Sequence, residues 1–290
     1  MRKKLIAIAT LLSGVVSGIA AEKSADPVDL KWIGPTPTVN TPSSFGVPFD
    51  KGMVTPTSEF NMTTADGQNL PHDFWVLAYW PDGSVKWGGF SAVVPADNAN
   101  VTLTPKKITK KSKKKKSTLP TGYVTETPEQ YIVQTGEISA YIPRHGSNLV
   151  DSIVKGGLRN SGAIRLVAET ETKAQTSEGK AITEQRNFVS TLDSVKVEQA
   201  GNVRTVIKLM GRHTSESRGW LPFTVRLYFT KGSEQMRMVH TIVYDGDQNT
   251  DMISALGVQV DVPLREQPYN RHVAFATTEG GVWSEPIQPL

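Results

Sequence analysis

The sequence contains no cysteine, so a disulfide or a thiolate-bound metal is excluded and the fold depends on its hydrophobic core. After residue 20 no apolar run is long enough to cross a bilayer. Helical periodicity is also missing outside the first residues, and no Gly-x-Ser-x-Gly elbow, nucleotide fingerprint or zincin helix occurs. These absences indicate a β-rich chain, and we assign no catalytic residue and no resident cofactor.

The first twenty residues have the layout of a secretory signal peptide. A basic start at residues 2–4 precedes an apolar run from Leu5 to Ala20, and Gly18 and Ala20 are small enough for cleavage after residue 20. We therefore expect a signal peptide at residues 1–20, a mature chain at residues 21–290, and a periplasmic or extracellular location. An uncleaved membrane anchor is the alternative.

Short segments with alternating apolar residues dominate the rest of the sequence. Leu221–Phe229, for example, places every second, apolar side chain on one face, as a half-buried strand requires. Met236–Tyr244 is apolar on both faces, so we expect a strand covered on both sides. Glycine-containing turn signals separate the segments, which predicts an all-β, antiparallel barrel or sandwich. Further predicted strands are Tyr131–Val133, Ile138–Ile142, Ile164–Ala168, Phe188–Glu198, Val203–Leu209, Ile253–Val262 and Val273–Thr277.

The segment from Tyr79 to Trp87 predicts a β-hairpin. Pro81 and Asp82 suit the central positions of a turn, and Gly83 can adopt the left-handed conformation that closes a bulged hairpin. A phosphate-binding loop is disfavoured, because no helix start follows to supply free amide groups.

A lysine-rich loop at residues 105–120 carries eight lysines between Lys106 and Lys116. Such a charge run binds polyanions, and export favours an acidic polysaccharide. Nucleic acid is disfavoured, because no aromatic side chain is interleaved for base stacking. A solvated loop without a partner is the alternative. A domain boundary in this loop is conceivable, but the segment before it is short, so we predict a single domain.

The histidines show no metal-ligand spacing. His240 shares a strand face with apolar residues and is expected to be a hydrogen-bonded core residue, whereas three others lie near turn residues: His72, His145 and His213.

One acidic loop could hold calcium through the carboxylates of Asp245, Asp247 and Asp251. Its glycine and glutamate positions do not match an EF-hand, so an acidic hairpin loop is the favoured interpretation.

Several motifs together resemble the exo-rhamnogalacturonan lyase-like family. They are Phe45–Gly52, Leu70-Pro71, Tyr79–Trp87, Leu256–Leu264, Tyr269–His272 and Gly280–Leu290. The resemblance covers nearly all of the mature chain. It implies a RIFT-type β-barrel, which in this family precedes a helical toroid and a further β domain.

The resemblance also implies β-elimination at a galacturonate residue of pectic rhamnogalacturonan. The sequence stops at Leu290, before a toroid, so we expect an exported N-terminal β domain that is not catalytic alone. Candidate residues for contact with substrate or with the toroid are Tyr269, Arg271, His272 and Trp283. The expected partners are that toroid or an acidic plant polysaccharide. A stand-alone glycan-binding module is the alternative, and an intact enzyme using His145 or His272 ranks last.

Overall fold

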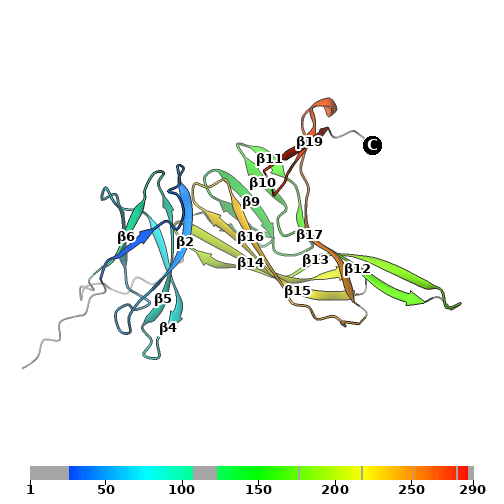
Figure 1. Cartoon of the computed structure of the whole chain (residues 1–290), viewed down its shortest axis with the longest axis horizontal. Coiled ribbons are helices and arrows are strands. Elements are labelled where there is room, and N and C mark those ends of the chain that lie inside the picture. Colours follow the sequence, from blue (N-terminus) through cyan, green and yellow to red (C-terminus); the bar gives the residue numbers. More distant parts are fainter. Residues whose placement is uncertain are drawn as a thin grey trace, which may run out of the picture.

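The computed structural model describes residues 26–106, 123–175, 177–216, 218–249, 251–278 and 280–286. The expected signal peptide and residues 107–120 of the lysine-rich loop lie outside these ranges. Within them the chain is almost entirely antiparallel β-structure, which confirms the predicted fold class. Figure 1 shows a smaller N-terminal unit, a larger central unit and a C-terminal hairpin that projects from it.

Two three-stranded sheets form the N-terminal unit. Their strands, in spatial order, are β1 (Val28–Lys31), β6 (Asn100–Pro105) and β3 (Phe60–Thr64), then β2 (Thr41–Pro48), β5 (Val85–Val94) and β4 (His72–Tyr79). The core between them centres on Phe90, whose ring centroid lies 4.9 Å from that of Phe60 and 5.1 Å from that of Phe74. Aromatic packing thus joins the two sheets.

The predicted hairpin is present and connects β4 to β5. Gly83 has a φ of 82°, and the Asp82 carboxylate accepts hydrogen bonds from the amide and hydroxyl of Ser84 at 3.0 and 2.6 Å. The indole of Trp80 donates to the Phe49 carbonyl at 2.9 Å. Register shifts on either side of Ala78 confirm the bulge. The motif is therefore a structural corner of the N-terminal unit.

The central unit packs a five-stranded sheet against a six-stranded sheet. The first consists of β11 (Leu158–Ser161), β10 (Ser152–Lys155), β9 (Ile138–Pro143), β8 (Gln130–Gln134) and β7 (Val124–Glu126). The second consists of β16 (Met236–Ile242), β15 (Arg218–Thr230), β14 (Arg204–Ser215), β13 (Ala181–Ala200), β12 (Ile164–Gln175) and β17 (Met252–Val260). Leu166, Ile207 and Leu227 are among the fully buried side chains between them.

Two strand predictions needed correction. The hairpin of β12 and β13 is far longer than the predicted strands Ile164–Ala168 and Phe188–Glu198. The prediction missed its outer half, because the polar residues there show no apolar alternation. Figure 1 shows this outer half projecting from the sheet. β16 is an edge strand that ends at Ile242, so Val243 and Tyr244 are exposed and the prediction of a doubly covered Met236–Tyr244 is wrong.

The described residues contain separate hydrophobic cores before and after the lysine-rich loop. We predicted one domain because the N-terminal segment looked too short to bury a core. Its six strands nevertheless bury Met62, Phe90 and Leu103 completely. The described residues thus have one core in the N-terminal unit and, in the central unit, a main core and a smaller cluster around Phe188 and Trp220.

The C-terminal segment adds the helical turn η1 (Pro268–Asn270) and a hairpin of β18 (His272–Ala276) and β19 (Val282–Pro286). Across the described ranges, no helix has the length and hydropathy that a membrane crossing needs.

Candidate functional site

The two units meet where β4 approaches the turn before β14. The Asp73 carboxylate accepts hydrogen bonds from the backbone amides of Asn202, Val203 and Arg204 at 2.7, 3.0 and 2.7 Å. A side chain at position 201 would collide with this carboxylate, so the turn needs Gly201. A nearly buried anion thus holds the second unit through three charge-assisted hydrogen bonds.

Arg204 reinforces the contact from the second unit. Its guanidinium lies 3.9 Å from the ring centroid of Trp75, and its Nη atoms donate to Ser44 Oγ at 3.2 Å and to Gln199 Oε1 at 2.5 Å. Burial lowers the pKa of Arg204, but an arginine remains charged in proteins. The cation therefore joins the sheet of β2, β5 and β4 to the central unit.

Tyr123 anchors the same turn from the central core. Its hydroxyl donates to the Val203 carbonyl at 3.0 Å, and burial raises the pKa of Tyr123 to about 12. The hydroxyl therefore stays protonated and remains a donor. The turn that bonds Asp73 is thus also hydrogen-bonded to the core of the central unit.

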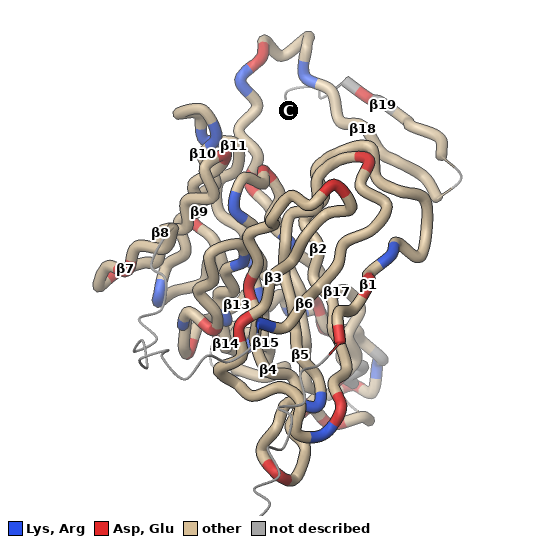
Figure 2. The backbone as a smooth tube through the Cα atoms, turned by 90° about the vertical axis from the view of Figure 1, so that its left-hand side faces the viewer, with Lys and Arg blue, Asp and Glu red and all other residues tan. Residues whose placement is uncertain are grey.

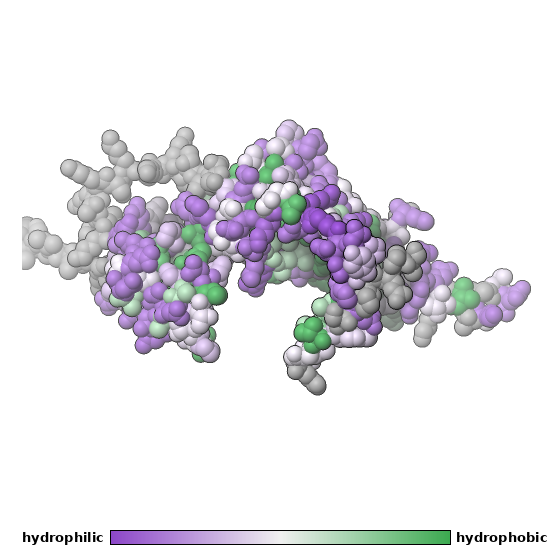
Figure 3. Space-filling view, turned by 90° about the horizontal axis from the view of Figure 1, so that it is seen from above, coloured by the Kyte–Doolittle hydropathy of each residue, from purple (hydrophilic) through white to green (hydrophobic). Residues whose placement is uncertain are grey.

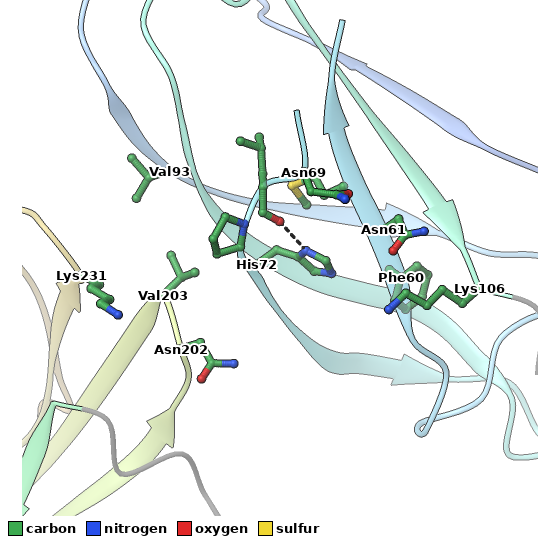
Figure 4. A pocket seen from close by; sticks show the side chains of 12 residues that line it. Phe60, Asn61, Asn69, His72, Val93, Lys106, Asn202, Val203 and Lys231 are labelled. Atoms are coloured by element: carbon green, nitrogen blue, oxygen red, sulfur yellow. Dashed lines mark hydrogen bonds between the residues drawn. The ribbon is translucent and has the colours of Figure 1, made fainter. Parts of the chain in front are cut away.

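A cleft of about 740 Å³ opens beside this junction. Figure 4 shows side chains of both units around it, with His72 between the N-terminal strands and the Asn202–Val203 turn. Its lining residues are Phe60, Asn61, Met62, Asn69, Leu70, Pro71, His72, Val93, Lys106, Asn202, Val203 and Lys231. The volume lies within the range of small-molecule and cofactor sites.

The polar groups of the cleft are cations and amides. His72 Nδ1 donates a hydrogen bond to the Leu70 carbonyl at 3.0 Å, and this bond does not involve the other ring nitrogen, Nε2. Lys106 forms a long, exposed ion pair with Glu59 at 3.4 Å, and the Lys231 side chain has no ion pair with any described residue. Three asparagines contribute amide groups: Asn61, Asn69 and Asn202.

No aspartate or glutamate is among the described residues that line the cleft. Lys106 and Lys231 come from different units, so their positive charges face the same space from two sides. Such an arrangement can neutralise a carboxylate and hydrogen-bond hydroxyl groups, while the apolar floor contacts the ligand's carbon skeleton.

The residues singled out in the sequence gather in the C-terminal segment instead. Tyr269 is exposed in η1, Arg271 Nε donates to the Glu266 carbonyl at 2.6 Å, and His272 begins β18. Trp283 packs against Phe275 across the hairpin, with ring centroids 6.3 Å apart. None of these candidates lines the cleft.

The carboxylates of the acidic loop accept hydrogen bonds from groups of the protein itself. Asp251 accepts two hydrogen bonds from Arg218, both at 2.7 Å, and Asp245 accepts the Leu221 amide at 2.8 Å. Asp247 accepts the Asn249 amide at 2.8 Å. Within the described ranges, no group of three His, Cys, Asp or Glu residues is placed to hold a metal.

Two histidines differ from expectation. His213 lies fully buried in β14, and its Nδ1 bonds the Leu221 carbonyl at 2.9 Å. His240 packs beside it, with ring centroids 6.1 Å apart, but its Nε2 is buried without a hydrogen-bond partner, so the prediction of a hydrogen-bonded core histidine is wrong. Burial lowers the pKa of both imidazoles.

Sequence reasoning missed Asp73 and Arg204 as junction residues. The only available signal was the turn at Gly201-Asn202, and its partner lies about 130 positions away in the chain. No local pattern indicates a contact of that separation.

The chain is thus a two-unit, antiparallel β protein whose units are joined by a polar junction. Residues 26–106 match the family model of the PcRGLX-like N-terminal RIFT barrel domain, and residues 123–290 match that of the PcRGLX-like protein central beta sandwich domain. The chain belongs to this PcRGLX-like family, which confirms the resemblance to exo-rhamnogalacturonan lyase-like proteins.

The chain is also similar to the uncharacterized protein YetA of Bacillus subtilis (strain 168). The two are 29% identical over 262 residues, which cover 89% of this chain and 30% of YetA. The chain thus spans under a third of this relative's length.

Proposed function

We propose that this chain is the exported, β-rich part of a rhamnogalacturonan lyase-like protein, and that it takes part in the degradation of pectic polysaccharide by binding uronate residues. Family membership supports the substrate class. The observation that carries the binding role is the cleft between the units, which is lined by cations and amides without a carboxylate.

The cleft favours an acidic glycan over a neutral one. Lys231 has no acidic partner among the described residues, and the ion pair of Lys106 with Glu59 is exposed to solvent, so uronate carboxylates can replace solvent at the two ammonium groups. Asn202 and Asn69 can bond the sugar hydroxyls that flank it. Because the lysines come from different units, a bound uronate bridges the two units at the Asp73 junction.

Neutralising the two cleft lysines is expected to weaken binding of rhamnogalacturonan oligosaccharides. For Lys106→Gln/Lys231→Gln we expect a loss of about tenfold in affinity by isothermal titration calorimetry, since each partly exposed ion pair contributes up to about 1 kcal/mol. The loss should shrink at high salt, where surface charges are screened.

Lys155→Gln is the matched control, because Lys155 is an exposed lysine paired with Glu234 at 2.7 Å outside the cleft. It should bind like the wild type. Equal affinities for the double variant and the wild type would contradict the cleft as the uronate site.

The isolated chain is expected to bind the polymer without cleaving it. β-Elimination creates a conjugated, unsaturated uronate that is followed by ultraviolet absorbance. Among the described lining residues, His72, Lys106 and Lys231 are groups that can move a proton, but no tyrosine or carboxylate accompanies them. Growth of that absorbance with purified protein, abolished in His72→Gln, would show instead that the chain itself is catalytic.

We further propose that the C-terminal strands contact a helical domain of the longer protein. Phe275 and Trp283 are 54% and 62% exposed, and the outer residues Leu256 and Val258 of β17 are also exposed. Figure 3 shows hydrophobic residues on the projecting C-terminal part of the molecule. An apolar surface of this kind is typical of an interaction site, and Tyr269, Arg271 and His272 lie in the same segment.

The alternative is a stand-alone glycan-binding module. The exposed aromatic side chains of the N-terminal unit favour it, because they can bind sugar rings without any further domain. Full-affinity binding by this chain alone supports the alternative, whereas a gain in affinity on adding a helical domain supports the lyase-like assembly.

A further inference from the structure

The outer face of β4 and β5 carries an apolar patch that the fold leaves uncovered. Leu77 and Trp87 are 56% and 41% exposed and lie side by side, and Tyr79, which is 57% exposed, ends β4; we call these three residues the aromatic platform. Gly46 of the neighbouring strand lies under it, since a Cβ there would be 3.5 Å from both Leu77 Cδ1 and Trp87 Cε3. The platform is therefore continuous across the sheet.

A groove of about 420 Å³ continues from the platform towards the central unit. It is lined by Trp75, Leu77, Glu198, Gln199, Arg204, Val206 and Tyr228. The indole of Trp75 lies against Gly89, where any side chain would collide with it, and Arg204 stacks on the indole. Gly89 thus lets the indole lie flat against this face of the sheet.

The charged side chains of the groove are held by contacts within the protein. Arg204 is held by Gln199, Ser44 and the Trp75 ring. Glu198 accepts hydrogen bonds from Arg226 Nε and Nη2 at 2.6 and 3.0 Å. In contrast to the cleft, the groove presents an aromatic surface with hydrogen-bonding groups on its rim, and the cation among its described lining residues, Arg204, is stacked on the Trp75 ring. Figure 2 shows how closely the acidic and basic positions are interspersed along the chain.

We propose that the aromatic platform and its groove bind the face of an uncharged pyranose ring. The carbon-bound hydrogens of such a ring pack on Trp87 and Leu77, and its hydroxyls reach the Gln199 amide and the Tyr228 hydroxyl on the rim. This inference rests on the proposed function, in that the chain binds polysaccharide. It adds a second subsite, for neutral sugars, which is separate from the uronate cleft.

The test uses rhamnogalacturonan whose carboxylates have been reduced to primary alcohols, so that only neutral rings remain. Trp87→Ala is expected to lower the affinity for this polymer about fivefold, as expected for the loss of one aromatic stacking contact. Tyr79→Ala, a change at a more exposed position, should act in the same direction and keeps the test valid if Trp87→Ala fails to fold. Both are compared with the wild type by calorimetry and Trp fluorescence.

Leu158→Ala is the matched control, because it removes an apolar side chain that is 57% exposed from β11 of the central unit, outside the platform and the groove. It should leave binding unchanged, and Lys231→Gln should not affect the reduced polymer. The inference is overturned if the wild type does not bind the reduced polymer, or if Trp87→Ala and Tyr79→Ala bind it like the wild type. A loss of native, acidic polymer binding in Lys106→Gln/Lys231→Gln alone would then leave the proposed function standing.

Discussion

Asp73→Ala is expected to uncouple the two units, so that calorimetry shows two unfolding transitions in place of one. The change leaves the amides of Asn202, Val203 and Arg204 without their acceptor at a nearly buried position. Hydrogen bonds to a charged group contribute about 1.5–3 kcal/mol each, and partial rehydration restores some of that, so we expect a net loss of about 3 kcal/mol of unfolding free energy. Affinity for the acidic glycan should fall as well, because the Lys106 and Lys231 walls are no longer held together.

Asp29→Ala is the control for that experiment. Asp29 also lies in the N-terminal unit and accepts a hydrogen bond from Thr102 Oγ1 at 2.8 Å, but the pair is exposed and joins two strands of the same unit. Its effect should stay within about 0.5 kcal/mol. A single, unshifted transition for Asp73→Ala would refute the role assigned to this carboxylate.

Acidification is expected to destabilise the central unit through His213 and His240. Both imidazoles have a lowered pKa because they are buried, and His213 adds a repulsive contribution at His240. Above pH of about 6.5 both residues are neutral in the folded and unfolded states, so they leave stability unchanged. As the pH falls below that value, the unfolded imidazoles take up protons that the folded ones do not, and the unfolding free energy decreases until the folded pKa is reached.

His240→Leu isolates this effect, because the His240 ring has no hydrogen bond with a described residue to lose. Chemical denaturation between pH 5 and pH 8 should show a smaller loss of stability at the acidic end than in the wild type. His145→Leu, at an exposed turn, should keep the wild-type pH dependence. Parallel pH profiles for His240→Leu and the wild type would contradict the assignment.

The hairpin of β4 and β5 was predictable because its causes are local. Pro81, Asp82 and Gly83 determine the turn within a few residues, and the alternation on either side determines the strands. The long outer half of β12 and β13 was not predictable, because its polar residues are paired across the hairpin and have no core to face. We predicted that β16 is covered on both faces, because nothing in its own sequence indicates that it lies at the edge of the sheet.

The sequence by itself determined the all-β class, the family and the corner around Gly83, because these follow from short-range periodicity, turn chemistry and linear motifs. Only the tertiary structure decided that Asp73 accepts hydrogen bonds from the turn at Val203, and that Lys106 and Lys231 line one cleft. Those contacts join side chains and amides that lie more than a hundred positions apart, and their formation depends on how two separately packed cores meet. The same holds for the aromatic platform: its residues were visible in the sequence, but whether an indole is buried or exposed depends on what the rest of the chain packs against it.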